Sequence, residues 1–137
     1  MPSGTYTLLI ELDAPERIDV GALGPRDFEA GWYAYTGTAF GPGGFDRIDR
    51  HREVAAGRNE TRHWHVDYLT GSDHARIDGA CRTPEVDAEC RFSDRIDGRR
   101  VPGFGASDCD CDSHLVYNPS RERLLSSLRT IHERCEV

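Results

Sequence analysis

The chain has 137 residues, enough for one domain that buries a core of its own, and its formal net charge is −7 at pH 7. An acidic chain is a poor general ligand for polyanions, because phosphate contacts dominate affinity for nucleic acid, so any such surface has to be local. No stretch approaches the roughly twenty apolar residues of a membrane helix, and the N-terminus lacks the basic and apolar segments of a secretion signal. We therefore expect one soluble, cytoplasmic domain over residues 1–137, without membrane contact.

The first half of the chain predicts strands followed by helices. Residues 4–13 mix apolar and β-branched side chains and stop just before a proline, which predicts a buried strand. Glycines and a proline interrupt residues 17–31, which indicates an extra hairpin, and the aromatic run at residues 32–36 predicts the next core strand. Apolar positions on one face predict a helix over residues 45–54, and a threonine cap indicates a second helix over residues 61–69.

The second half alternates between strands and helices. Residues 75–81 predict a third strand, and Thr83 before Pro84 is typical of a helix start, so we expect a helix from there through residue 97. A short strand over residues 115–117 precedes a leucine-rich C-terminal helix over residues 119–134. The predicted fold class is α/β, an α+β sandwich: a small, mostly antiparallel three-stranded core sheet flanked by helices, with an extra hairpin between the first two core strands.

Two tyrosine-containing triplets stand at the outer ends of the first two predicted core strands. Gly4-Thr5-Tyr6 begins the first strand, and Tyr35-Thr36-Gly37 ends the second. Arg47 and His51 follow in the run RIDRH on the first helix, and Glu89 in AEC follows the third strand. In this order the pieces resemble the signature of the GIY-YIG endonuclease superfamily.

Two further stretches extend the resemblance over nearly the whole chain. RHWHVDYL (residues 62–69) and GFGASDCDCDSHLVY (residues 103–117) are similar to stretches of the archaeal Uri branch of that superfamily. Threonine replaces isoleucine in both triplets, which keeps a β-branched side chain. Twenty-eight residues separate Tyr6 from Tyr35, more than the tight hairpin usual in the superfamily allows. These departures affect the inference about the fold less than they affect the inference about the substrate.

The resemblance implies a GIY-YIG nuclease-like fold and a divalent-metal-dependent endonuclease that hydrolyses phosphodiester bonds of nucleic acid, with DNA as the expected substrate and repair as the expected role. Glu89 is a hard oxygen ligand suited to Mg²⁺ or Mn²⁺. Arg47 can hold the scissile phosphate and stabilise developing negative charge. Tyr35 is the expected general base once nearby positive charge favours its ionised form, while Tyr6 orients water or phosphate and His51 helps to move the proton.

Each of these residues also has a purely structural interpretation. A tyrosine at a strand end is usually a half-buried core residue, and arginines and glutamates on helices are usually solvated. Two other functions therefore remain open: a nucleic-acid-binding module without catalysis on the same scaffold, and a zinc-stabilised interaction domain. The sequence does not identify a repair enzyme as a partner.

The first predicted helix and the segment after it form a mildly basic island, in which five arginines exceed four acidic residues. Arg50, Arg52 and Arg62 are the candidates for contacts with nucleic acid in this island. Alternating charges more commonly form a solvated, salt-bridged surface, which is the competing interpretation.

A cysteine- and aspartate-rich stretch precedes the last predicted strand. Its Cys109, Cys111 and His114, joined by His63 or His65, have the residue types of a tetrahedral zinc site. The Cys-x-Cys spacing is atypical of such sites, so we expect a structural loop and no requirement for zinc. Five cysteines are an odd number in a chain without a secretion signal, which predicts reduced thiols.

The charged residues have an unusual composition, since all seventeen basic residues are arginine and aspartate outnumbers glutamate. This composition resembles that of proteins from salt-accumulating archaea, whose acidic surfaces keep them soluble where salt screens charge within a few ångströms. A GC-rich genome would explain the missing lysine but not the acidic excess. We therefore expect a halophilic protein.

Overall fold

The computed structural model describes residues 3–40, 43–58, 65–104 and 113–137, and its strands within these ranges form one six-stranded antiparallel sheet and a separate hairpin. The order in the sheet is β6 (Arg99–Arg100), β7 (Leu115–Asn118), β4 (Gly31–Thr38), β1 (Gly4–Leu12), β5 (Ala75–Pro84) and β8 (Arg134–Glu136). The hairpin pairs β2 (Glu16–Asp19) with β3 (Pro25–Phe28), and the 3-10 helix η1 (Gly21–Leu23) joins them.

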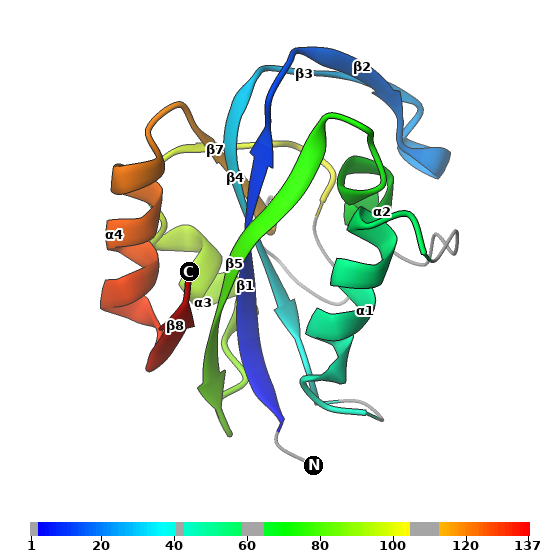
Figure 1. Cartoon of the computed structure of the whole chain (residues 1–137). Helices are drawn as coiled ribbons and strands as arrows, with labels where there is room; N and C mark the ends of the chain where they lie inside the picture. The colour runs from blue at the N-terminus through cyan, green and yellow to red at the C-terminus, as the bar shows by residue number, and fades with distance from the viewer. Residues whose placement is uncertain (1–2, 41–42, 59–64, 105–112) are drawn as a thin grey trace.

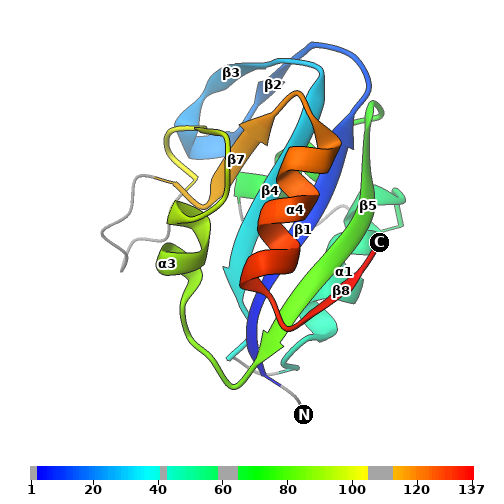
Figure 2. The ribbon, with the colours of Figure 1, turned by 90° about the vertical axis from the view of Figure 1, so that its left-hand side faces the viewer.

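Helices lie on both sides of the sheet. α1 (Asp46–Ala55) and α2 (His65–Thr70) cover one face, α4 (Arg121–Ile131) covers the other, and α3 (Glu89–Asp94) packs beside β4 (Figure 1, Figure 2). The central strand β1 is buried on both faces: Leu8 and Ile10 point into the core below α1 and α2, and Leu9 points into the core below α4. This two-sided burial explains the continuous apolar run of β1. No helix in the described ranges has the length and apolarity needed to span a bilayer.

The expected α+β class, the antiparallel pairing and the extra hairpin are confirmed, but the three-stranded sheet is wrong. β7 and β6 extend the sheet beyond β4, and β8 extends it beyond β5. β6 has two residues and β8 has three, so neither is long enough to show the alternation of apolar and polar residues that predicts a strand.

Two helix boundaries are also wrong. The helix expected from Thr83 is instead the end of β5, because Thr83 and Pro84 pair with the first residues of β1. The chain then turns at Glu85, whose φ is +65°, and α3 begins only at Glu89. The C-terminal helix ends at Ile131, because the next residue is extended and leads into β8.

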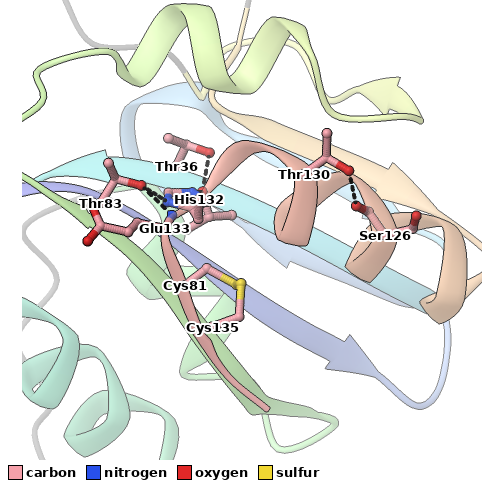
Figure 3. Close-up of a disulfide and its surroundings, with 9 residues drawn as sticks. Thr36, Cys81, Thr83, Ser126, Thr130, His132, Glu133 and Cys135 are labelled. Carbon is pink, nitrogen blue, oxygen red and sulfur yellow. Dashed lines mark hydrogen bonds between the residues drawn. A yellow bond between two sulfur atoms is a disulfide. The ribbon is translucent and has the colours of Figure 1, made fainter.

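The C-terminal strand β8 brings a cysteine against β5. Cys135 is the register partner of Cys81, and the two form a disulfide (Figure 3). Cys90 is also disulfide-bonded. The expectation of reduced thiols is therefore wrong for these three cysteines, because an odd number of cysteines does not reveal which of them a short edge strand places in register.

A buried polar cluster fixes the start of β8 on the sheet. His132 Nε2 lies 2.7 Å from Thr7 Oγ1, and His132 Nδ1 lies 3.1 Å from Thr83 Oγ1 (Figure 3). Thr7 Oγ1 is also 2.9 Å from Thr36 Oγ1, so the cluster joins β4, β1 and β5. Burial lowers the pKa of His132 to about 4, so the neutral imidazole is the form that these contacts accommodate.

We expect the His132 cluster to make folding stability depend on pH under acidic conditions. The folded-state pKa of about 4 lies below the ordinary value of 6.5, so the stabilisation is complete above pH 6.5 and is lost as the pH falls from 6.5 towards 4. The loss should reach about 3 kcal/mol, measured by chemical denaturation across this window. His132→Gln should remove this part of the pH dependence and His74→Gln, at an exposed position, should keep it. Parallel pH curves for wild type and His132→Gln would contradict the assignment.

Acidic and basic side chains pair on the surface beside α4. Arg76 lies 2.6 Å from Glu11 and 2.7 Å from Asp78, and Arg121 lies 2.9 Å from Asp78. Such exposed pairs contribute little individually and leave the net charge of −7 unbalanced.

We expect the protein to lose stability when salt is withdrawn, because its excess negative charge then repels itself over a longer screening length. The midpoint temperature of unfolding, measured in dilute and in molar KCl, should rise with salt. A midpoint that does not change with salt would contradict the halophilic interpretation of the composition and leave codon bias as its explanation.

Candidate active site

Glycines in the two triplets permit close contacts between neighbouring strands. Tyr6 on β1 is the register partner of Gly37 on β4, and a Cβ atom at Gly37 would lie 2.7 Å from Tyr6 Oη. A Cβ atom at Gly4 would lie 2.1 Å from the carbonyl oxygen of Thr83 on β5. Any other residue would clash at both positions, so each glycine has a packing reason. Gly37 leaves the space in which the Tyr6 side chain lies over β4.

The hydroxyl of Tyr6 begins a series of polar contacts that runs from β1 through α1 to α2. Tyr6 Oη lies 2.8 Å from His51 Nε2, and both side chains are buried. His51 Nδ1 lies 3.4 Å from Asp67 Oδ1, and the Asp67 side chain is 0% exposed. Arg50 donates to both oxygens of Asp67, at 3.4 and 3.0 Å. The packing of α1 against α2 thus places a histidine in contact with the first tyrosine, and a buried carboxylate and its arginine behind that histidine.

The second tyrosine and the helix arginine lie beside this series. Tyr35 on β4 is half-buried, and its ring meets that of His51 edge-on, with centroids 6.1 Å apart. Arg47 lies one helical turn before His51 and donates to the carbonyl oxygen of Thr38 at 2.6 Å. This bond holds the guanidinium at the end of β4, on the strand that carries Tyr35.

The negative charge of Glu89 acts on the pKa of both tyrosines, so Glu89 lies near them. Burial is the main cause that raises the pKa of Tyr35 above the ordinary tyrosine value, and the negative charges of Glu89 and Asp67 raise it further. Burial likewise raises the pKa of Tyr6, and Arg47 lowers the pKa of both tyrosines without reversing the shift. The protein alone therefore keeps both phenols protonated at neutral pH, so the expected ionisation of Tyr35 needs positive charge beyond that of Arg47.

Glu89 itself begins α3 and is partly accessible, with 16% of its side chain exposed. Its Oε2 lies 3.8 Å from Nδ1 of His114, which is buried just before β7. His114 Nε2 lies 3.4 Å from Cys90 Sγ. His114, a candidate zinc ligand from its sequence position, is therefore a neighbour of the candidate metal ligand Glu89.

A single accessible carboxylate fits Mg²⁺ better than it fits zinc. Mg²⁺ keeps several waters and is commonly held through one or two carboxylates, whereas structural zinc takes four protein ligands. The described ranges contain no group of three His, Cys, Asp or Glu side chains suited to a metal. His65 instead lies 3.3 Å from the carbonyl oxygen of Gly103. The other candidate zinc ligands, Cys109, Cys111 and His63, lie outside the described residues.

The arginines predicted to contact nucleic acid have different surroundings. Arg50 contacts the buried carboxylate of Asp67, and 19% of its side chain is exposed. Arg52 lines a surface hollow between α1 and β5, together with Asp49 and Arg82. Arg62 lies outside the described residues. Arg50 thus contacts a buried carboxylate, whereas Arg52 lies at the surface of the helix.

The sequence-based selection of site residues missed Asp67. This residue lies in the HWHVDYL stretch and occupies a fully buried position of α2. A buried carboxylate is costly unless it is paired, so an aspartate between the apolar residues Val66 and Leu69 is a signal that marks a partner in the core. The sequence does not show which of the many arginines or histidines is that partner.

The comparison with protein families gives one match, which covers nearly the whole chain. Residues 5–137 match the family described as "Domain of unknown function DUF123", and the chain belongs to this family. No curated protein and no solved structure matches the chain. The family description assigns no activity, so the chemistry of the site is the basis for a functional proposal.

Proposed function

We propose that this protein is a divalent-metal-dependent endonuclease of the GIY-YIG type, related to the Uri branch, that hydrolyses phosphodiester bonds in nucleic acid. The observation that carries the proposal is the convergence of Tyr6, Tyr35, Arg47 and Glu89. These side chains come from β1, β4, α1 and α3, and the charges of Arg47 and Glu89 act on both tyrosines. Convergence of a hard carboxylate, a fixed guanidinium and two phenols is what phosphodiester hydrolysis needs.

The guanidinium of Arg47 is the group that would hold the scissile phosphate. One of its nitrogens donates to the Thr38 carbonyl, which fixes the orientation of the planar group at the end of β4. A guanidinium held in this way stabilises charge that develops on the phosphoryl oxygens without having to reorganise. Arg52, on the same helix, supports binding of the flanking nucleic-acid backbone.

The half-buried phenol of Tyr35 is the group that would take the proton from the attacking water. Tyr35 is partly exposed, whereas Tyr6 is buried and its hydroxyl faces His51. Glu89 is the residue that would hold Mg²⁺ or Mn²⁺, and the ion would supply positive charge against the phosphate and against the carboxylates that raise the pKa of Tyr35. The pKa of Tyr35 is raised, and one cause is the negative charge of Glu89. Ionisation of Tyr35 as the base would therefore depend on the metal bound by Glu89.

We expect Tyr35→Phe to slow cleavage about 10²-fold while leaving folding and nucleic-acid affinity nearly unchanged, because only a hydroxyl is removed. Since the pKa of Tyr35 is raised, the wild-type rate should increase with pH from neutral to alkaline conditions, and the variant should lose this increase. Single-turnover rates as a function of pH measure both effects. Tyr33→Phe removes a hydroxyl from the same strand, where it donates to the Glu29 carbonyl, and should leave the rate unchanged. Equal pH profiles for wild type and Tyr35→Phe would exclude Tyr35 as the base.

The experiment that tests the proposed function is an incubation of the purified protein in concentrated KCl with a panel of labelled nucleic acids. The panel contains duplex, flap, bubble and single-stranded DNA and the corresponding RNAs, with Mg²⁺, with Mn²⁺ and with a chelator. We expect metal-dependent cleavage of at least one member and none with the chelator. Binding without cleavage of any member would overturn the proposal in favour of a nucleic-acid-binding module, and the absence of both would reject a nucleic-acid partner.

A further inference from the structure

We propose that Asp67 is a positioning residue of this site, which acts through His51 to orient the hydroxyl of Tyr6. The inference rests on the proposed function for its effect on cleavage. Its structural part, the orientation of the Tyr6–His51 contact by Asp67, is open to a test that needs no activity.

A series of contacts links Asp67 to Tyr6 through His51. Arg50 donates to both carboxylate oxygens of Asp67, at 3.0 and 3.4 Å, and a carboxylate held by a guanidinium accepts hydrogen bonds only. His51 Nδ1 lies 3.4 Å from Asp67 Oδ1, which is an ion-pair distance without the geometry of a hydrogen bond, so the carboxylate acts on the ring through its negative charge. The proton of the neutral imidazole is therefore favoured on Nδ1, and Nε2 is left as the acceptor.

The position of this proton decides what Tyr6 presents to the site. With Nε2 as an acceptor, the hydroxyl of Tyr6 donates to His51 across the 2.8 Å contact, and the oxygen lone pairs remain for a water or another donor. The opposite tautomer would donate from Nε2 to Tyr6 and turn the phenolic hydrogen outwards. Asp67 thus favours a Tyr6 hydroxyl that donates to His51 and leaves its oxygen as an acceptor, over one whose hydrogen points away from His51.

Charged and titratable groups from three described elements lie around His51. Tyr6 from β1, Tyr35 from β4 and Asp67 from α2 all face His51 from α1. Arg47, from the same helix as His51, acts on both tyrosines. Burial raises the pKa of Tyr6, which keeps its hydroxyl protonated and able to donate to His51.

The burial of Asp67 supports a role beyond packing. A fully buried carboxylate and its arginine are costly to desolvate, and apolar residues of similar volume often stabilise a core as well or better. An acidic group at this position does what an apolar one cannot, because it fixes the proton on the histidine. The inference also explains why Arg50 points inwards although the sequence predicts it as a phosphate contact.

Nitrogen NMR of the His51 ring tests the structural part in the full-length wild-type protein. At mildly alkaline pH we expect a protonated Nδ1 and an unprotonated Nε2, with the signals assigned by their loss in His51→Gln. In Asp67→Asn the amide can donate to Nδ1, so the proton should move to Nε2. A protonated Nε2 in the wild type, or an unchanged tautomer in a folded Asp67→Asn, would overturn the inference. The wild-type measurement decides the question even if the variant does not fold.

Steady-state kinetics test the link to cleavage. Asp67→Asn should lower kcat about 10²-fold with little change in KM, because it disturbs a group that orients the reaction and not one that binds the substrate. Asp27→Asn, the same change at an exposed position of the β2–β3 hairpin, should alter neither value. If the wild type does not cleave, the proposed function fails while the tautomer result still stands. If the wild type cleaves and Asp67→Asn matches it, the inference fails and the proposed function survives.

Discussion

Replacing Glu89 by glutamine should abolish metal-dependent cleavage and leave nucleic-acid binding largely intact. The substitution keeps the size of the side chain but removes the negative charge that a hard divalent cation requires. Glu89 is partly accessible at the start of α3, so an amide at this position should be tolerated by the fold. The measurements are the single-turnover rate with saturating Mg²⁺ or Mn²⁺ and the dissociation constant of the substrate without metal.

The first turn of α4 offers a matched control for this variant. Glu122 also lies in the first turn of its helix and is exposed, and α4 covers the face of the sheet opposite to α1 (Figure 2). Glu122→Gln should keep the wild-type rate and metal dependence. Undiminished cleavage by Glu89→Gln would show that the metal binds elsewhere, and a loss of folding would be visible in the thermal transition.

Removal of the Arg47 guanidinium should slow cleavage by about 10²-fold or more and weaken substrate binding only modestly. A fixed guanidinium interacts more strongly with the charge of the transition state than with the ground-state phosphate, so Arg47→Ala should lower kcat much more than it raises KM. The contact with the Thr38 carbonyl is lost as well, at a cost of about 1 kcal/mol in stability. Steady-state kinetics and chemical denaturation separate these two effects.

Two companion variants sharpen the test of Arg47. Arg47→Lys keeps the charge but loses the planar fork, so its rate should lie between those of wild type and Arg47→Ala. Arg129→Ala removes an arginine from the last turn of α4, on the other face of the sheet, and should leave the rate unchanged. If Arg47→Ala raises KM and leaves kcat unchanged, Arg47 binds the phosphate backbone of the nucleic acid and does not stabilise the transition state.

The fold was predictable where burial determines the pattern of side chains. The strand at β1 and the strand at β4 have apolar and β-branched runs, and both lie in the centre of the sheet as expected. The region around Thr83 shows the opposite case, because its threonine–proline pair matches a helix start while its pairing with β1 extends a strand. The local sequence cannot show whether a helix or a strand forms here, since the partner strand β1 lies at the start of the chain.

The sequence offers as candidate site residues those that belong to ordered motifs. Tyr6, Tyr35, Arg47 and Glu89 lie far apart in the sequence, and the structure places them around the end of β4. Asp67 was not predictable, because its role depends on how α2 packs against α1. The pairing of Cys81 with Cys135 was missed for a similar reason, since it depends on how β8, which follows His132 at the end of α4, lies against β5.

One side-by-side measurement tests the central claim most directly: single-turnover cleavage of one substrate, with Mg²⁺ in molar KCl, by wild type, Tyr35→Phe, Arg47→Ala and Glu89→Gln purified in the same way. We expect wild type to cleave, Tyr35→Phe and Arg47→Ala each to be slower by about 10²-fold, and Glu89→Gln to give no product. If wild type cleaves and all three variants cleave equally fast, the residues around the end of β4 are not the active site.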